Sequence, residues 1–207
     1  MTDEITQFTE ILKNSVDEKR FRHSLGVMNE AETLAERHGA DKNKAKIAGL
    51  LHDITKNLSV PEHLSLIRAH SPNEDPEEVK SPNLLHAITA PIVLRNKLGI
   101  KDPEILSAVR RHTTAKPGLT LLEKILFVAD FTEPNRQYAD VEYYRKAARE
   151  DIDKALFLGL RWGLGNLLAR GEYIYKNTWE TYNYYILNFH TADYIAEFQG
   201  KTERMIP

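Results

Sequence analysis

Apolar residues recur at helical spacing along most of the chain, and polar capping residues stand where these stretches begin. The clearest stretch follows Ser15 and Glu18, which have the spacing of a capping box, and it ends at Gly39. Its apolar residues return every three or four positions, as one face of an α-helix requires: Val16, Phe21, Leu25, Met28, Ala31, Leu34 and Ala35. We therefore predict a long helix that begins at Ser15 and is closed by Gly39.

Similar start signals recur further along the chain. Most combine a polar cap with a nearby acidic residue or with a proline in the first turn. They stand at Asp41, Ser59 with Glu62, Asp75 with Pro76 and Glu78, Asp102 with Pro103, Thr120 with Glu123, and Asn177 with Glu180. The alternating pattern of strands is almost absent, and residues 172–175 are the one run expected to be extended. We predict an all-α fold of six to nine helices in a single domain that covers residues 1–207.

The composition narrows the class of protein. The 207 residues include 28 Lys and Arg against 30 Asp and Glu, a net charge of −2, and 42% of them are hydrophobic. This is typical of a globular protein, and the lack of a basic surplus argues against nucleic acid as a partner. The sequence has neither an apolar run long enough for a membrane span nor the pattern of a signal peptide, so we expect a cytoplasmic protein.

The chain has no cysteine, so a metal ion would have to be held by His, Asp and Glu. Four such residues stand beside apolar helical runs. His52 and Asp53 follow one run, His23 lies in the long helix, and Asp130 closes the run at residues 125–129. Two imidazole nitrogens and two carboxylates suit iron, manganese or zinc better than calcium. These four residues are the candidate metal ligands.

Two further histidines join an apolar helical face to a possible cleft. His86 follows a pair of leucines, and His112 ends the helix that begins at Asp102. They are candidates for additional metal ligands or for hydrogen-bond donors to phosphate. The remaining histidines lack this setting and are expected to be solvated or to cap helices: His38, His63, His70 and His190.

The segments around these residues form a recognisable set. They are residues 22–24 (RHS), 50–56 (LLHDITK), 85–87 (LHA), 111–114 (RHTT) and 128–136 (VADFTEPNR). Together they resemble the YqeK family of the HD superfamily of metal-dependent phosphohydrolases, whose H…HD…D signature is matched by His23, His52, Asp53 and Asp130. The resemblance implies an all-α HD-domain helical bundle with C-terminal helices packed on it. It also implies that these four residues hold a divalent metal, iron before manganese or zinc, and that the protein cleaves diadenosine tetraphosphate symmetrically.

The chemistry of such a site assigns roles to the charged residues around the metal. A bound cation lowers the pKa of a water molecule and polarises the phosphoryl group that the water attacks. Asp53 is expected to orient this water, while Lys56 and Arg20 offset the charge that develops on phosphate. Arg136 follows Asp130 in the sequence and suits a bidentate phosphate contact.

The nucleotide needs polar donors and a stacking surface. We assign His86 and His112 to phosphate oxygens beside a single metal, with Thr113 and Asp130 contacting the same nucleotide. The stacking surface is assigned to Phe131 and to the loop that contains Arg170, Gly171, Tyr173, Ile174 and Tyr175. The alternative for this loop is a helix end, with Gly171 closing the helix and the tyrosines packed on the bundle; both can hold together.

Three functions are considered for the whole chain. The first is a phosphohydrolase that converts dinucleoside polyphosphates to two ADP, with removal of terminal phosphates as its alternative. The second is a nucleotide-sensing module, and the third is an HD-type oxidase with a diiron site. The complete ligand set together with Lys56 favours catalysis over sensing. The aromatic segment from Trp179 to Phe189 is expected to pack in the core or to form the face of a homodimer.

Overall fold

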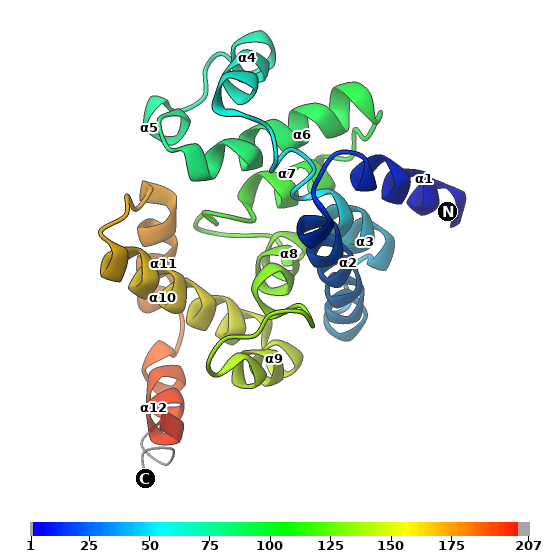
Figure 1. The fold of residues 1–207 in the computed structure, drawn as a ribbon. Helices are drawn as coiled ribbons and strands as arrows, with labels where there is room; N and C mark the ends of the chain where they lie inside the picture. Colours follow the sequence, from blue (N-terminus) through cyan, green and yellow to red (C-terminus); the bar gives the residue numbers. More distant parts are fainter. Residues whose placement is uncertain (1, 203–207) are drawn as a thin grey trace.

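The structure is a computed structural model that describes residues 2–202, and every regular element in that range is a helix (Figure 1). Within this range the chain forms twelve α-helices and one short 3₁₀ helix: α1 (Thr2–Lys13), α2 (Glu18–His38), α3 (Lys42–Leu51), α4 (Val60–His70), α5 (Pro76–Val79), η1 (Pro82–Leu84), α6 (Leu85–Lys97), α7 (Pro103–Arg111), α8 (Leu121–Thr132), α9 (Val141–Glu150), α10 (Ile152–Arg170), α11 (Lys176–Asn188) and α12 (Thr191–Thr202). The predicted all-α class is confirmed, with more helices than expected.

Most of the predicted caps lie at the observed helix starts. Their side chains accept backbone N–H groups or form capping boxes at the starts of α3, α4, α5, α7 and α8: Asp41, Ser59 with Glu62, Asp75, Asp102, and Thr120 with Glu123. Gly39 ends α2 with a left-handed φ of 78°, a conformation in which a Cβ would be strained. Polar side chains therefore set the starts of these five helices, and a glycine sets the end of α2.

Two predicted helix starts are wrong. Ser15 does not cap α2, because its hydroxyl donates to the carbonyl of Ile11 at the end of α1, and Asp17 provides the cap instead. Asn177 lies inside α11, whose N-cap is Tyr175. Tyr175 is buried and its hydroxyl is 3.1 Å from a carboxylate oxygen of Asp75, so a tertiary contact anchors the start of this helix. Residues 172–175 are non-helical but do not form a strand.

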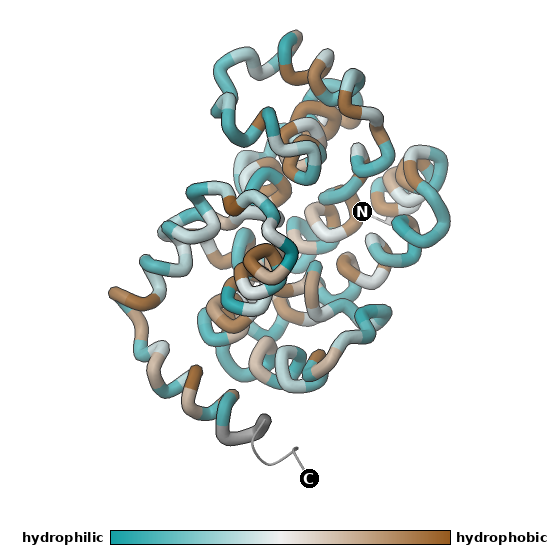
Figure 2. Tube along the Cα trace, turned by 60° about the vertical axis from the view of Figure 1, so that its left-hand side comes forward, coloured by the Kyte–Doolittle hydropathy of each residue, from teal (hydrophilic) through white to brown (hydrophobic). Residues whose placement is uncertain are grey.

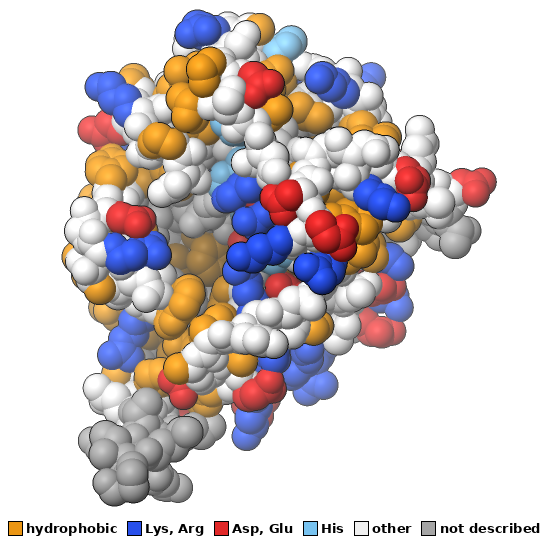
Figure 3. Space-filling model, in the orientation of Figure 1, with side chains coloured by type: hydrophobic (Ala, Val, Ile, Leu, Met, Phe, Trp, Pro, Cys, Tyr) orange, Lys and Arg blue, Asp and Glu red, His pale blue; other side chains and the backbone are white. Residues whose placement is uncertain are grey.

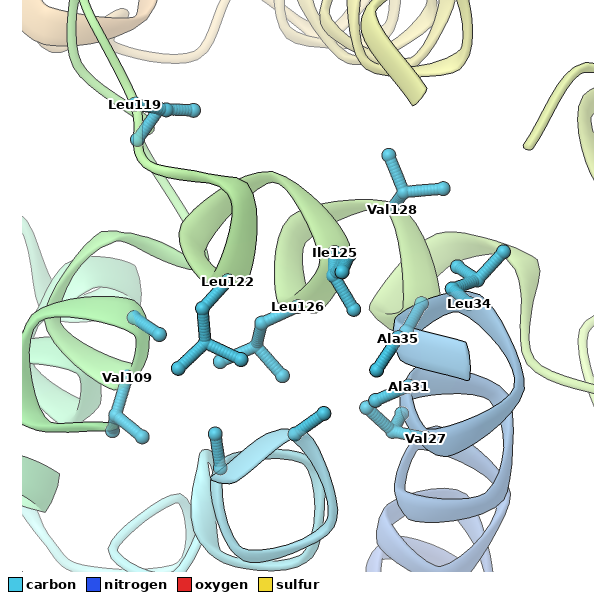
Figure 4. Close-up of a cluster of buried hydrophobic side chains, with 14 of the residues drawn as sticks. Val27, Ala31, Leu34, Ala35, Val109, Leu119, Leu122, Ile125, Leu126 and Val128 are labelled. Atoms are coloured by element: carbon cyan, nitrogen blue, oxygen red, sulfur yellow. The ribbon is translucent and has the colours of Figure 1, made fainter. Parts of the chain in front are cut away.

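Helix α8 lies at the centre of the bundle. It packs against α2, α3, α7, α9 and α10, and its apolar side chains lie between those of α2 and α7 (Figure 4). Leu122, Ile125 and Leu126 of α8 are buried together with Val27 and Val109. Hydrophobic residues are concentrated where the helices meet, while the loops are mostly hydrophilic (Figure 2). The core therefore fixes the relative positions of the helices that carry the predicted ligands.

A smaller apolar cluster lies between α4 and α6 and contains Ile67 of α4 with Leu85 and Ile88 of α6. His63 of α4 is buried beside it, with Nδ1 2.8 Å from the hydroxyl oxygen of Thr89. The expectation that His63 is solvated or caps a helix is therefore wrong. This histidine lies inside α4 and links it to α6.

The C-terminal helices lie on one side of the molecule (Figure 1). Helices α11 and α12 both pack against α10, and Tyr185 of α11 is buried with its hydroxyl bonded to Asp153. Lys154 of α10 is paired with Glu197 of α12. No helix in the described range combines the length and the apolarity needed to cross a membrane.

Substitution Leu126→Ala should lower the free energy of unfolding by about 2–5 kcal/mol, because it leaves a cavity at the centre of the bundle. Leu168, which is 69% exposed on α10, is the matched control, and Leu168→Ala should change the free energy of unfolding by less than about 0.5 kcal/mol. Urea denaturation followed by circular dichroism measures both. Equal losses in the two variants would contradict the central position of α8.

Candidate active site

The four predicted metal ligands meet in one place. His23 lies in α2, His52 and Asp53 follow the last residue of α3, and Asp130 lies in the last turn of α8. His23 Nε2 is 3.0 Å from Asp130 Oδ1, and His52 Nε2 is 3.4 Å from Asp53 Oδ2 and 3.9 Å from Asp130 Oδ1. Two consecutive helices, α2 and α3, and the distant α8 thus bring two imidazoles and two carboxylates together.

The end of α3 orients His52. The helix stops at Leu51, and His52 Nδ1 donates to the carbonyl of Gly49, 2.7 Å away in the same turn. Gly49 also lets α3 approach α2 closely, because a Cβ at this position would lie 2.8 Å from the Cα of Met28. The helix ends before His52, which is its C-cap, and this directs the Nε2 atom of His52 toward the cluster.

His86 and His112 lie on the other side of Asp53. His86 is in the first turn of α6, and His112 is the C-cap of α7, as predicted. His86 Nε2 is 3.2 Å from Asp53 Oδ1 and 3.2 Å from His112 Nε2. His112 Nδ1 donates to the carbonyl of Val109, so its Nε2 also faces the cluster, 3.7 Å from Asp53 Oδ1. Asp53 is therefore the carboxylate shared by all the imidazoles.

Several of these buried atoms lack a hydrogen bond of acceptable geometry: Nε2 of His23, Nε2 of His52 and Oδ1 of Asp53. Buried polar atoms almost always have a partner, so the exceptions indicate a missing ligand. In each of two groups of three residues, the potential ligand atoms all lie within 4.8 Å of one another. One group is His23, His52 and Asp130, and the other is His52, Asp53 and His112. The donor types and the orphaned nitrogens fit a divalent metal ion such as iron, manganese or zinc.

Most of the protonation states also suit metal binding. The exception is His23: burial opposes its protonation, but hydrogen bonds to Asp130 and Glu133 raise its pKa above the ordinary value, so a cation has to displace that proton. Burial lowers the pKa of His52 and of His86, so both imidazoles are neutral at neutral pH. Burial opposes the ionisation of Asp53 and Asp130, but the neighbouring imidazoles outweigh it and hold the pKa of both carboxyls well below the ordinary value. Neutral imidazole and ionised carboxylate are the forms that coordinate a cation.

Three partly exposed cations surround the carboxylates. Arg20 Nη1 is 2.6 Å from Asp53 Oδ2, and Arg136 Nη2 is 2.8 Å from Asp130 Oδ1. Lys56 Nζ is 3.9 Å from Asp53 Oδ1 and 3.0 Å from His86 Nε2. Lys and Arg side chains gather along one edge of a hollow on this face of the molecule, with histidine atoms visible inside the hollow (Figure 3). The site therefore combines a cation-binding centre with a positively charged rim.

A cleft of about 660 Å³ adjoins the cluster. Thr113 and Thr114, which directly follow His112, form the wall nearest the cluster, and the hydroxyl oxygen of Thr113 is buried without a partner. Other walls come from three separate parts of the chain, namely residues 77–84, α10, and residues 172–178 at the start of α11, with Phe127 from α8. The lining residues are Glu77, Lys80, Ser81, Pro82, Asn83, Leu84, Phe127, Gly159, Leu160, Gly163, Leu167, Glu172, Tyr173, Tyr175 and Thr178.

Only some of the predicted nucleotide contacts line this cleft. Tyr173 and Tyr175 line the cleft. Arg170, Gly171 and Ile174 lie in the adjoining loop outside the residues that line it, and Gly171 closes α10 with a left-handed φ of 64°. Both readings of the loop, a helix end and a cleft wall, therefore apply.

Phe131 does not line the cleft. Its ring packs against Gly159, where a Cβ would lie 2.4 Å from the ring, and it meets Phe127 and Tyr144 edge to face. Phe127, one turn earlier on α8, lines the cleft in its place. The helical period alone could not distinguish the two, because both lie on α8 and the position of α10 decides which ring is exposed to the cleft.

Two further residues were not singled out from the sequence. Glu133 is buried with Oε1 3.1 Å from His23 Nδ1, and Gly163 leaves open space in the wall of the cleft. The spacing of Gly159, Gly163 and Leu167, four residues apart on one helical face, is a signal that could have indicated a groove along α10.

Comparison with known proteins agrees with this geometry. The HD domain model matches residues 20–135, which is more than half of the chain and spans all six clustered histidines and aspartates. A solved structure of a predicted HD superfamily hydrolase involved in NAD metabolism from Clostridium acetobutylicum superposes with a TM-score of 0.84 at 37% identity. The match covers 87% of this chain and 96% of that one.

Curated relatives carry a specific name. A protein of Bacillus subtilis named bis(5′-nucleosyl)-tetraphosphatase, symmetrical, is 37% identical over 84% of this chain and 94% of its own length. A protein of the same name from Staphylococcus aureus is 30% identical over 84% of this chain and 91% of its own length. The resemblance inferred from the sequence motifs is confirmed, and the chain belongs to the HD-domain hydrolases and, within them, to the YqeK family of symmetrical bis(5′-nucleosyl)-tetraphosphatases.

Proposed function

We propose that this protein hydrolyses diadenosine tetraphosphate and related dinucleoside polyphosphates to two ADP with the help of a divalent metal ion. The observation that carries the proposal is a buried cluster of imidazole and carboxylate groups, next to a cleft large enough for a nucleoside. In this cluster Nε2 of His23, Nε2 of His52 and Oδ1 of Asp53 lack hydrogen-bond partners. The name shared by the curated relatives supports this choice of substrate.

The metal is proposed to be held by His23, His52, Asp53 and Asp130, with iron favoured over manganese and zinc. Two neutral imidazoles and two carboxylates are a ligand set that iron accepts. When bound, such a cation acts as a Lewis acid on a phosphoryl oxygen and lowers the pKa of the attacking water. Arg20 and Arg136 then hold Asp53 and Asp130 in place, because each arginine donates to one of these carboxylates.

The phosphate chain is proposed to lie across the positively charged rim. Lys56, Arg20 and Arg136 are each between 28% and 37% exposed, so their charged groups can reach a substrate from the surface. Lys56 also contacts His86, which places an ammonium and an imidazole side by side near Asp53. These groups offset the charge that grows on the phosphoryl oxygens as the bond to the leaving half breaks.

His86 and His112 are proposed to bind phosphate oxygens beside a single metal. Because His112 Nδ1 already donates to the carbonyl of Val109, donation from His112 Nε2 to phosphate requires the doubly protonated ring. His112 also belongs to the second group of three donors, with His52 and Asp53, so a second cation is the alternative for this side of the site. The number of metal ions per chain separates these two arrangements. Thr113 is proposed to add a hydroxyl donor, since its oxygen is buried without a partner next to His112.

One nucleoside is proposed to occupy the cleft between α10 and the loop before α11. Tyr173 and Tyr175 line this cleft together with Phe127, and aromatic rings provide stacking surfaces for a base. Arg170, Gly171 and Ile174 are proposed to shape the loop that carries the tyrosines, and Phe131 is proposed to support Phe127, with which it packs edge to face.

Further proposals concern the chain as a whole. We take residues 1–207 as a single domain, since one apolar core extends from Phe8 to Tyr185. A homodimer through α11 is supported by its exposed apolar side chains, among them Leu187, which is 82% exposed, and Trp179, which is 47% exposed. A cytoplasmic location is in keeping with a sequence that lacks cysteine and so folds without disulfides.

Substitution His52→Ala or Asp53→Ala should abolish bound metal and activity while helical content stays nearly unchanged, because both residues follow the end of α3. Metal analysis of the purified protein and circular dichroism measure the two effects, and the wild-type protein should hold one metal ion per chain. His70→Ala, an exposed histidine at the end of α4, is the control and should keep metal and turnover. Full occupancy in His52→Ala would refute the ligand set.

Substitution Gly163→Leu should raise the KM for diadenosine tetraphosphate at least tenfold, about 1.4 kcal/mol of binding free energy, by filling the cleft. The new side chain enters open space in a helix, so the melting temperature should not fall. Gly165→Leu on the same helix also meets open space but lies outside this cleft, and it should leave the KM unchanged. An unaltered KM in Gly163→Leu would exclude the cleft as the nucleoside site.

Hydrolysis of diadenosine tetraphosphate should give ADP as the only nucleotide product, because attack at the second phosphate from the held nucleoside releases an identical half. In water labelled with heavy oxygen, one ADP per turnover should carry a single label. Chromatography with mass spectrometry resolves the products. ATP and AMP in equal amounts from the start would contradict symmetrical cleavage, and labelled orthophosphate as the main early product would indicate a terminal phosphatase.

A further inference from the structure

A buried carboxylate stands behind the proposed metal ligand His23. Glu133 ends α8, three residues after Asp130, and only 1% of its surface is exposed. Its Oε1 atom is 3.1 Å from His23 Nδ1, whereas His23 Nε2 points the other way, 3.0 Å from Asp130 Oδ1. Glu133 therefore contacts the imidazole nitrogen that is not available to the metal.

The carboxylate of Glu133 is held from several directions. Its Oε2 atom accepts hydrogen bonds from the backbone N–H of Asn135, at 2.7 Å, and from the side-chain amide of the same residue, at 2.9 Å. The carbonyl oxygen of Glu133 accepts from Arg145 Nη2 at 2.8 Å. The nearest cation, Arg136, approaches Oε1 only to 3.9 Å, so hydrogen bonds rather than a close ion pair fix this side chain.

A glycine in the facing helix leaves room for this carboxylate. A Cβ at Gly26, in the interior of α2, would lie 2.3 Å from Glu133 Oε2 and 2.9 Å from Asn135 Nδ2. Glycine is unfavourable inside a helix compared with alanine, so its presence calls for a local reason. The space that Glu133 occupies provides that reason.

The contact also favours the tautomer of His23 that binds a cation. Carboxylates face both ring nitrogens, Glu133 at Nδ1 and Asp130 at Nε2. When a cation occupies Nε2, the ring proton lies on Nδ1, where the Glu133 carboxylate accepts it. His52 and His112 reach the same tautomer by donating to the carbonyls of Gly49 and Val109. His23 alone among these three donates to an anionic partner, which increases the basicity of the imidazole and strengthens its bond to a cation.

We propose that Glu133 is a positioning residue that orients His23 and raises the affinity of the site for a divalent cation, and that Gly26 admits its carboxylate. The inference rests on the proposed metal site and deepens it. Glu133 does not itself contact substrate or metal in this proposal; it acts through His23.

The test measures Co²⁺ affinity of the full-length chain by competition with a chelating dye, together with the visible absorption spectrum of the bound Co²⁺. Glu133→Gln should weaken Co²⁺ binding about 10- to 100-fold, and Glu133→Ala should weaken it further, because glutamine keeps an acceptor for His23 but loses the charge. Glu123→Gln is the matched control, since Glu123 is equally buried on α8 but caps its opposite end. It should keep wild-type affinity.

Gly26→Ala provides an independent approach to the same contact. The added methyl group should displace the Glu133 carboxylate and weaken Co²⁺ binding, and it should add little to the loss in Glu133→Ala, because both changes break the same contact. Gly165→Ala, a helical glycine with open space around it, is the control and should leave Co²⁺ affinity unchanged. The melting temperature without metal records any general loss of stability in each variant.

The outcomes separate this inference from the metal site on which it rests. If His52→Ala abolishes Co²⁺ binding while Glu133→Gln binds within twofold of the wild type, the role of Glu133 is refuted and the site stands. If Glu133→Gln and Glu123→Gln weaken Co²⁺ binding equally, the effect is one of stability, and the positioning role is also refuted. If His52→Ala binds Co²⁺ normally, the metal site itself is wrong.

Discussion

Ionised carboxylates and imidazole lone pairs are costly to bury, and this protein buries several of them at one point. Asp53 is almost fully buried among four imidazoles, and polar atoms of His23, His52 and Asp53 lack hydrogen-bond partners. Removing such groups from water is unfavourable unless a counter-charge compensates for the lost hydration. A cation bound between them provides that counter-charge, and the arrangement of the surrounding helices is consistent with holding one. Each proposed ligand stands in or beside a helix that α8 and its neighbours fix through the apolar core.

The same packing places the metal cluster, the positively charged rim and the cleft in different parts of the fold. The proposed metal ligands lie in or beside α2, α3 and α8, and the positively charged rim consists of side chains that reach the surface. The cleft lies between α10, residues 77–84 and the loop before α11. Tyr173 and Tyr175 tie that loop to residues 75–77 through hydrogen bonds to Glu77 and Asp75, so two walls of the cleft are joined directly. A substrate half could thus be held in the cleft while its phosphates reach the metal.

Much of this was accessible from the sequence because the signals are local. Asp41 and Thr120 indicate the starts of their helices through their capping side chains. His52 and Asp53 directly follow an apolar run that is visible in the sequence. The rest depends on contacts between distant segments. Phe131 faces Gly159 rather than the cleft, Tyr175 starts α11 through its bond to Asp75, and Glu133 meets His23 across 110 residues. No period or spacing within one helix encodes such pairs.

Anomalous X-ray scattering from crystals of the metal-loaded protein, recorded at the iron absorption edge, tests the central claim most directly. A single strong peak enclosed by His23, His52, Asp53 and Asp130 is the expected result. A second peak beside His86 and His112 would change the number of ions and keep the site. A peak elsewhere, or none in protein that is active and contains iron by analysis, would contradict the claim that this buried cluster exists to hold the metal.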